Sequence, residues 1–218
     1  MLSDLKERST ARCAPNDEAG HGVRARLERA RTEEGNGTLN RRGVFGLCAS
    51  VACVFAILTT TAASEDMENT LYLDLATGRV VIALRPDLAP MHVTRIKELA
   101  REGFYDGIVF HRVIAGFMAQ GGDPTGRGGG GSGKKLKAEF SGESFVRGTL
   151  GMARTDDPDS ADSQFFIMFA PAPHLNGQYT VWGQVTEGME LVDRLAKGEP
   201  PAKPDQIVKM SVAADEAE

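Results

Sequence analysis

From residue 65 onward, short apolar segments alternate with turn residues, and only two segments have a helical pattern. The runs at 70–75 and 79–84 are separated by a short turn sequence containing Gly78, which predicts two strands joined by a turn. Further strands are expected at 109–114, 117–120, 149–152, 165–169, 179–185 and 207–212. Two helices cannot cover both faces of a parallel sheet, and closure removes exposed strand edges. We therefore predict a mainly β fold, a closed eight-stranded antiparallel β-barrel flanked by two α-helices.

The two helices have separate signals. Pro90 suits the first position of a helix, and an apolar stripe that includes Ile96 and Leu99 stops before Gly103. The second helix is expected over 189–196, where Gly198 follows its end. Residues 65–218 are thus expected to form one globular domain.

The first 64 residues have a different character. Residues 1–40 are polar and show no sustained hydrophobic period. We therefore expect an N-terminal extension that is disordered, or that is assigned to the protein through a wrong start codon. Residues 41–64 begin with two arginines, continue in an uncharged apolar run and end in small residues, an order typical of a signal peptide. The apolar run at 44–58 is shorter than the about 20 residues that span a membrane. A retained single N-terminal membrane anchor is the alternative.

A signal peptide preceded by 40 polar residues is unusual. We hypothesise that translation starts at Leu39, read from an alternative start codon, so that residues 1–38 are not translated. The expected location is periplasmic or secreted. If the signal is retained, the protein is instead anchored in the membrane and faces the periplasm.

Cysteine usage and charge exclude several function classes. The three cysteines are Cys13, Cys48 and Cys53, so residues 65–218 contain no disulfide, Cys-ligated zinc or thiol nucleophile. The same segment holds 16 Lys and Arg against 23 Asp and Glu. That acidic balance argues against a nucleic-acid partner, which requires a basic face.

The most specific part of the sequence is VFHRVIAGFMAQGGD at residues 109–123. An arginine within an apolar strand, as at Arg112, is costly unless the side chain is paired or faces a cleft. Together with SQFFI at 163–167 and YTVWG at 179–183, this run closely resembles the cyclophilin-type peptidyl-prolyl cis-trans isomerases, specifically a bacterial, exported type. The resemblance covers roughly residues 69–212, and the family's eight-stranded barrel with two helices agrees with the fold expected from the strand pattern.

The resemblance implies rotation about X-Pro peptide bonds as the reaction, and assistance to protein folding as the role. Such bonds exchange isomers over tens to hundreds of seconds unaided. Catalysis requires localising the prolyl nitrogen lone pair and gripping the proline ring, so no cofactor and no metal are expected. The partners implied are proline-containing unfolded or extended polypeptides, bound by a monomer. The alternative is a binding module or chaperone of the same fold whose isomerase activity is incidental.

The site residues follow from the resemblance, position by position. Arg112 matches the family's catalytic arginine, and Gln120 matches the amide that orients it and hydrogen-bonds substrate. The residues matching the substrate-binding positions are Phe117, Met118, Ala153, Arg154, Gln164, Phe166, His174, Leu175 and Tyr179. His111 is expected to have a structural hydrogen-bonding role, because the reaction needs no titrating group.

Some positions depart from the common family pattern. Arg154 replaces an asparagine that contacts substrate through its backbone, so binding is expected to survive. His174 stands where many members carry tryptophan, and Tyr179 where they carry histidine; both keep a ring and a polar tip. We expect His174 to weaken cyclosporin binding without removing isomerase activity.

Two segments imitate other sites. Residues 128–134 satisfy G-x-x-x-x-G-K, but Lys135 stands where a phosphate-binding loop has Ser or Thr, and no helical pattern follows. The acidic residues at 156–162 lack the ligand spacing and terminal Glu of a calcium loop. We therefore interpret both as loops without a nucleotide or a metal.

Overall fold

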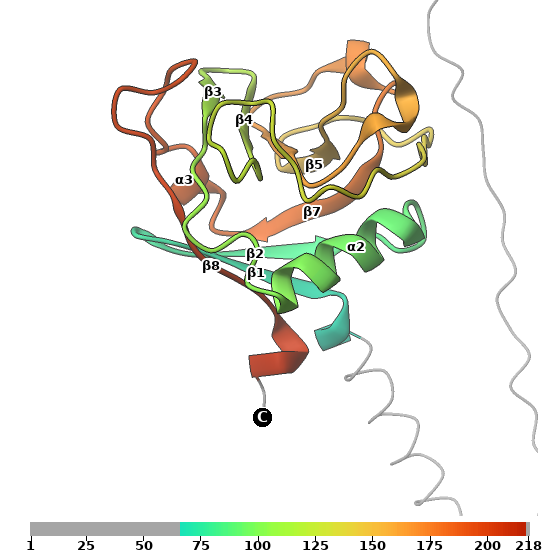
Figure 1. Cartoon of the computed structure of the whole chain (residues 1–218), viewed down its shortest axis with the longest axis horizontal. Coiled ribbons are helices and arrows are strands. Elements are labelled where there is room, and N and C mark those ends of the chain that lie inside the picture. The colour runs from blue at the N-terminus through green and yellow to red at the C-terminus, as the bar shows by residue number, and fades with distance from the viewer. Residues whose placement is uncertain (1–65, 217–218) are drawn as a thin grey trace, which may run out of the picture. The chain divides into compact units, whose positions relative to one another are not determined.

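The computed structural model in Figure 1 describes residues 66–216 of the 218-residue chain. The predicted extension at 1–40 and the predicted signal peptide at 41–64 lie outside the described residues. In the described part of the chain, no helix is long and apolar enough to cross a membrane.

Eight strands form one sheet. Their bounds are β1 Thr70–Leu75, β2 Gly78–Leu84, β3 Arg112–Ile114, β4 Met118–Gly121, β5 Thr149–Met152, β6 Phe165–Met168, β7 Val181–Glu187 and β8 Ile207–Val212. The order is β3-β4-β6-β5-β7-β2-β1-β8, and every pair is antiparallel. The prediction of a mainly β fold with eight antiparallel strands is confirmed.

The sheet curls into a half-barrel, so that β3 and β4 lie above β1, β2 and β8 in the view of Figure 1. Its two edges are β3 and β8, and within residues 66–216 no ladder pairs them. An isolated bridge joins Val109 to Gln206, and Phe110 N–H donates to the Asp205 carbonyl at 2.9 Å. These contacts explain why β3 starts at Arg112 rather than at 109 as predicted.

Two α-helices, α2 and α3, flank the sheet. Helix α2, Pro90–Arg101, buries Val93, Ile96 and Leu99, as the apolar stripe predicts. Its N-cap is Ala89, which has no capping side chain. Instead the Glu139 carboxylate accepts hydrogen bonds from the N–H groups of Met91 at 3.1 Å and His92 at 3.0 Å.

Helix α3 spans only Met189–Val192, four residues shorter than predicted. The next turn switches to bonds between residues three apart, Arg194 to Leu191 and Leu195 to Val192. The Ala196 N–H then donates to the Asp205 carboxylate at 2.7 Å, which draws the chain out of the helix.

Alternating side chains of β3, β4, β6 and β5 pack on opposite sides of the sheet. Val113, Ala119, Ile167 and Leu150 belong to the main hydrophobic core. On the other side, a second, smaller cluster forms around Phe166. Its other buried members are Met118, Phe145, Met168, Ala172, Leu175 and Val181.

Candidate active site

A row of cross-strand partners runs across the second face of the sheet. Arg112 of β3 lies opposite Gln120 of β4, Gln120 opposite Phe166 of β6, and Phe166 opposite Gly151 of β5. Directly opposed residues point to the same face, so one arginine, one amide and one aromatic ring are neighbours. The tight β3–β4 hairpin maintains this register, and its turn contains Gly116 at φ 71°.

A pocket of about 280 Å³ opens over this row, and we call it the apolar pocket. Its lining residues are Arg112, Phe117, Met118, Gln120, Ala153, Arg154, Phe166, Leu175 and Tyr179. All of them are residues that the sequence places in the site. Met118, Phe166 and Leu175 are buried and make an apolar floor, whereas Arg112 is the cation at the rim, with its side chain 42% exposed.

Gly151 of β5, which sequence reasoning missed, leaves the space that the Phe166 ring occupies. A Cβ on Gly151 would collide with the Phe166 ring and lie 2.7 Å from Phe145. The absence of a side chain there lets the Phe145 and Phe166 rings stack, with centroids 5.6 Å apart. Tyr179 meets Phe166 edge-on at 5.6 Å. The signal was a glycine within a buried strand, which marks close approach of another group.

The two predicted site residues outside the apolar pocket border it. His174 is exposed and stacks against Phe117, with ring centroids 5.9 Å apart. Gln164 lines a second pocket of about 280 Å³, the polar pocket, which shares Gln120, Ala153 and Arg154 with the first. The pockets therefore form one continuous groove.

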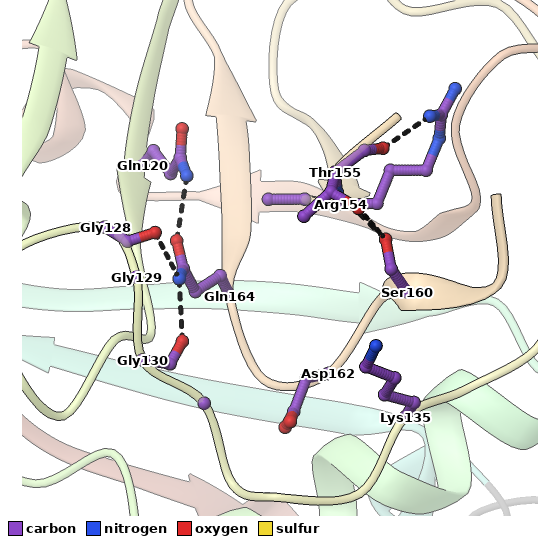
Figure 2. Close-up of a pocket in the computed structure, with 12 residues that line it drawn as sticks. Gln120, Gly128, Gly129, Gly130, Lys135, Arg154, Thr155, Ser160, Asp162 and Gln164 are labelled. Atoms are coloured by element: carbon purple, nitrogen blue, oxygen red, sulfur yellow. Dashed lines mark hydrogen bonds between the residues drawn. The ribbon is translucent and has the colours of Figure 1, made fainter. Parts of the chain in front are cut away.

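Gln164 connects Gln120 to the glycine-rich loop, as Figure 2 shows. Its Oε1 accepts from Gln120 Nε2 at 3.0 Å. Its Nε2 donates to the carbonyls of Gly128 at 3.0 Å and Gly130 at 2.8 Å. The residues directly after the loop, 134–148, form no helix.

Two buried or half-buried carboxylates anchor the glycine-rich loop. Asp123 accepts bonds from the Thr125 N–H at 2.7 Å and from its hydroxyl, and from Gly128 N–H. Burial opposes ionisation, but these hydrogen bonds outweigh it and lower the pKa of Asp123 to about 2. Asp162 accepts from Ser132 N–H at 2.6 Å and from Gly133 N–H at 3.0 Å. Both ends of the loop are thus tied to aspartate side chains.

Arg112 has a partner that no sequence motif indicates. Its Nε lies 2.6 Å from Oε2 of Glu199, a residue 87 positions later. Gln120, which the resemblance makes the orienting amide, faces Arg112 in register but donates to Gln164. Among the described residues, Glu199 is the only acceptor of a hydrogen bond from the Arg112 side chain.

Arg154, the residue that replaces asparagine, has a fixed guanidinium. It donates to the Gln178 carbonyl at 2.9 and 3.2 Å and to the Thr155 carbonyl at 2.7 Å. It also lies over the Tyr179 ring, 4.7 Å from the centroid. Arg154 lines both pockets, at the position where the resemblance expects main-chain contact with a peptide.

His111 lines a third cavity beside Arg112 and Glu199. Burial lowers its pKa, against the attraction of Asp123 and with the repulsion of Arg112, so the ring is neutral near pH 7. Neither ring nitrogen has a partner among the described residues, so the predicted hydrogen-bonding role is not seen. In the same part of the chain no group of three His, Cys, Asp or Glu side chains is placed to hold a metal.

The sequence matches a family model, described as "Cyclophilin type peptidyl-prolyl cis-trans isomerase/CLD", over residues 70–212. A "Probable peptidyl-prolyl cis-trans isomerase" of Brucella suis is 52% identical over 172 residues, covering 71% of this chain and 88% of the relative. "Peptidyl-prolyl cis-trans isomerase B" of Bacillus subtilis is 46% identical, covering 56% of this chain and 86% of that protein.

Solved cyclophilin structures are also similar to this chain. The cyclophilin AquaCyp293 from Hirschia baltica superposes with a TM-score of 0.63 at 30% identity, covering 69% of this chain and 76% of that one. A Cryptosporidium parvum cyclophilin-type peptidyl-prolyl cis-trans isomerase, solved "in the presence of dipeptide ala-pro", has a TM-score of 0.62 at 29% identity. That comparison covers 66% of this chain and 98% of the other.

Proposed function

The chain belongs to the cyclophilin-type peptidyl-prolyl cis-trans isomerases and catalyses X-Pro isomerisation, and we propose that the apolar pocket with Arg112 at its rim is the active site. One observation carries this proposal. A buried apolar floor adjoins the guanidinium of Arg112, in a groove that Ala153 also lines. Proline offers an apolar ring next to an amide, and the two halves of the pocket fit those two parts.

The mechanism needs no bond to break. The barrier of about 18–20 kcal/mol arises because the nitrogen lone pair is delocalised into the carbonyl. With the ring held on Met118, Phe166 and Leu175, the terminal nitrogens of Arg112 can donate toward the prolyl nitrogen. That hydrogen bond is strongest when the amide is twisted and the lone pair is localised on nitrogen, so it favours the transition state over either planar isomer.

Substitution of Arg112 tests the site. We expect Arg112→Ala to lower kcat/KM for isomerisation of a short Ala-Pro-Phe peptide by roughly 10²-fold, the usual effect of losing one electrostatic donor. Arg112→Lys should remain impaired, since an ammonium cannot reproduce the planar fork. The exposed Arg194 supplies the matched control, Arg194→Ala, which should retain activity. Equal rates for Arg112→Ala and the wild type would overturn the proposal.

We propose that the substrates are extended polypeptides containing proline. Ala153 lines both pockets and Gln164 lines the polar pocket, so the groove continues past the apolar pocket and suits an extended peptide. The dipeptide in the Cryptosporidium parvum structure is consistent with such a ligand. The protein is proposed to act as a monomer without a nucleic-acid partner; a sedimentation experiment that showed a dimer at working concentration would contradict the first point.

We further propose that residues 41–64 direct export, making this an exported bacterial member in the periplasm or outside the cell. The support is the order of arginines, apolar run and small residues, together with the lack of cysteine after Cys53. N-terminal sequencing of the protein from the periplasmic fraction should start near residue 65. A membrane-bound product that retains 41–64 would favour the anchor, and peptides from 1–38 would exclude translation from Leu39.

We also propose that the barrel is closed in solution by the backbone bonds between 107–110 and 205–207. Gly107 N–H donates to the Ile207 carbonyl at 2.7 Å, and Ile207 N–H to the Ile108 carbonyl at 2.9 Å. Slow hydrogen exchange of these amides, comparable to β1 and β2, is the expected result. Rapid exchange would indicate an open seam.

A further inference from the structure

The side chain of Arg112 is held on one side by Glu199. Its Nε lies 2.6 Å from Glu199 Oε2, a charge-assisted hydrogen bond of short length. Glu199 also lines the cavity that Arg112 shares with His111 and Pro200. The carboxylate therefore sits at the groove without forming part of the apolar pocket.

The backbone explains why Glu199 is there. Val113 and Gly198 exchange both hydrogen bonds, Val113 N–H to Gly198 O at 2.8 Å and Gly198 N–H to Val113 O at 2.9 Å. In that antiparallel register Arg112 lies opposite Glu199, just as β4 places Gln120 opposite Arg112 on the other side. Arg112 is thus the middle member of a three-residue row.

The contact leaves the reactive part of the guanidinium available. Glu199 occupies the Nε–H, and within residues 66–216 no hydrogen-bond partner is found for the two terminal nitrogens. Four N–H donors are therefore free to meet a substrate amide. With Arg112 42% and Glu199 52% exposed, water screens the pair, so its contribution to folding stability is small. The pair instead affects the orientation of the Arg112 guanidinium.

We propose that Glu199 is a positioning residue for Arg112, fixing the guanidinium through Nε so that its terminal nitrogens face the apolar pocket before substrate arrives. The inference rests on the proposed catalytic role of Arg112. An arginine without this partner would have to lose its rotamer freedom on binding or in the transition state, and preorganisation removes that cost.

The test compares Glu199→Ala with Glu199→Gln in the proline-isomerisation assay. We expect Glu199→Ala to lower kcat about fivefold with little change in KM, because orientation matters most in the twisted state. Glu199→Gln keeps an acceptor oxygen at the same reach and should recover to within about twofold of wild type. The exposed Glu187, for which no ion pair is found in the described residues, provides the control Glu187→Ala.

A spectroscopic readout separates positioning from a structural effect. The Arg112 Nε–H resonance should be resolved in the ¹H–¹⁵N spectra of the wild type and Glu199→Gln, and broadened by exchange with water in Glu199→Ala. In an Arg112→Ala background, Glu199→Ala should add no further loss, since the two residues act as a unit.

Three results would overturn the inference: unchanged kcat in Glu199→Ala, higher activity there, or an equal loss in Glu199→Gln. Higher activity would mean that the carboxylate competes with substrate for Arg112. These failures are distinguishable from failure of the proposed active site, which would appear as full activity in Arg112→Ala.

Discussion

Gln120 and Gln164 are joined amide to amide, with Gln120 Nε2 3.0 Å from Gln164 Oε1. The orientation of both amides is set by the carbonyls of Gly128 and Gly130, which can only accept and therefore require the Gln164 NH₂ group. Gln120 must then present its own carbonyl oxygen to the groove. The glycine-rich loop thus determines that the groove offers an acceptor at this point, suited to a peptide N–H.

Removing the Gln164 NH₂ donor should impair the enzyme. In Gln164→Glu a carboxylate would face two carbonyl oxygens with no hydrogen to share, which costs roughly 1–3 kcal/mol of unsatisfied or repulsive contact. We expect kcat/KM in the peptide assay to fall about tenfold or more. Gln206→Glu makes the same charge change at an exposed side chain and should leave activity near wild type. Comparable losses in both variants would contradict this role of the Gln164 hydrogen bonds.

Neighbouring glycines of the loop should respond differently to alanine. A Cβ on Gly130 would collide with Asp123 Oδ1 and lie 2.8 Å from Thr125 Cγ2, whereas a Cβ on Gly129 would meet nothing within 4 Å. We expect Gly130→Ala to lower the free energy of unfolding by about 1–3 kcal/mol, as overpacking does. Gly129→Ala should be within about 0.5 kcal/mol of wild type by urea unfolding. An unchanged free energy of unfolding in Gly130→Ala would show that the Asp123 side chain moves aside at little cost.

Glu139 should stabilise the protein at neutral pH and lose that effect in acid. Burial alone would raise its pKa, but hydrogen bonds from the His92 ring and from the Met91 and His92 N–H groups lower the pKa overall from the ordinary value of 4.5. A group whose folded pKa is depressed contributes stability above its unfolded pKa, and that stability disappears as pH falls through the folded pKa.

Glu139→Gln should therefore lose about 1–2 kcal/mol at pH 7, the scale of a lost helix cap. The difference from wild type in urea unfolding should shrink as the pH falls below 4.5, because the unfolded state then binds a proton that the native carboxylate, with its lowered pKa, still resists. Glu187→Gln, at an exposed position, should show no such pH dependence. A gap between Glu139→Gln and wild type that stayed constant from pH 7 to pH 3 would exclude the ionised cap.

His174 offers a test of inhibitor binding. It stacks on Phe117 with centroids 5.9 Å apart, so a larger ring at this rim would extend the apolar surface beside the pocket. We expect His174→Trp to tighten cyclosporin binding about tenfold, from the added aromatic area. Isomerase activity should change little. An unchanged inhibition constant would show that His174 is not the residue that weakens cyclosporin binding.

Sequence periodicity predicted most of the fold because strand alternation and local turn residues determine where strands lie. β1, β5 and β8 were predicted to the residue, as was the start of α2 at Pro90. The errors have tertiary causes. α3 stops early because the carboxylate of Asp205, nine residues further along the chain, accepts a hydrogen bond from the Ala196 N–H, and β3 is short because Val109 and Phe110 pair with 205–206 outside the ladder. Such contacts leave no periodic trace in the sequence.

The structure brings the predicted site residues together along one groove. Most of them lie on three short strands or directly beside them, so a linear motif carries their spatial arrangement. Glu199 lies in no motif and reaches Arg112 only through the bridge at Gly198. Gly151 also escaped notice, since its contribution is the space it leaves for Phe166.

The bridge between Val113 and Gly198 has a consequence for how such a chain can diverge. Because this one pair of backbone bonds sets the register that brings Glu199 to Arg112, a single residue inserted between Gly198 and Glu199 would leave every ladder of the sheet in place. It would nevertheless shift the carboxylate away from its arginine. We therefore expect the spacing between Gly198 and Glu199 to be preserved wherever the pair is kept, and position 199 to co-vary with position 112 among related chains.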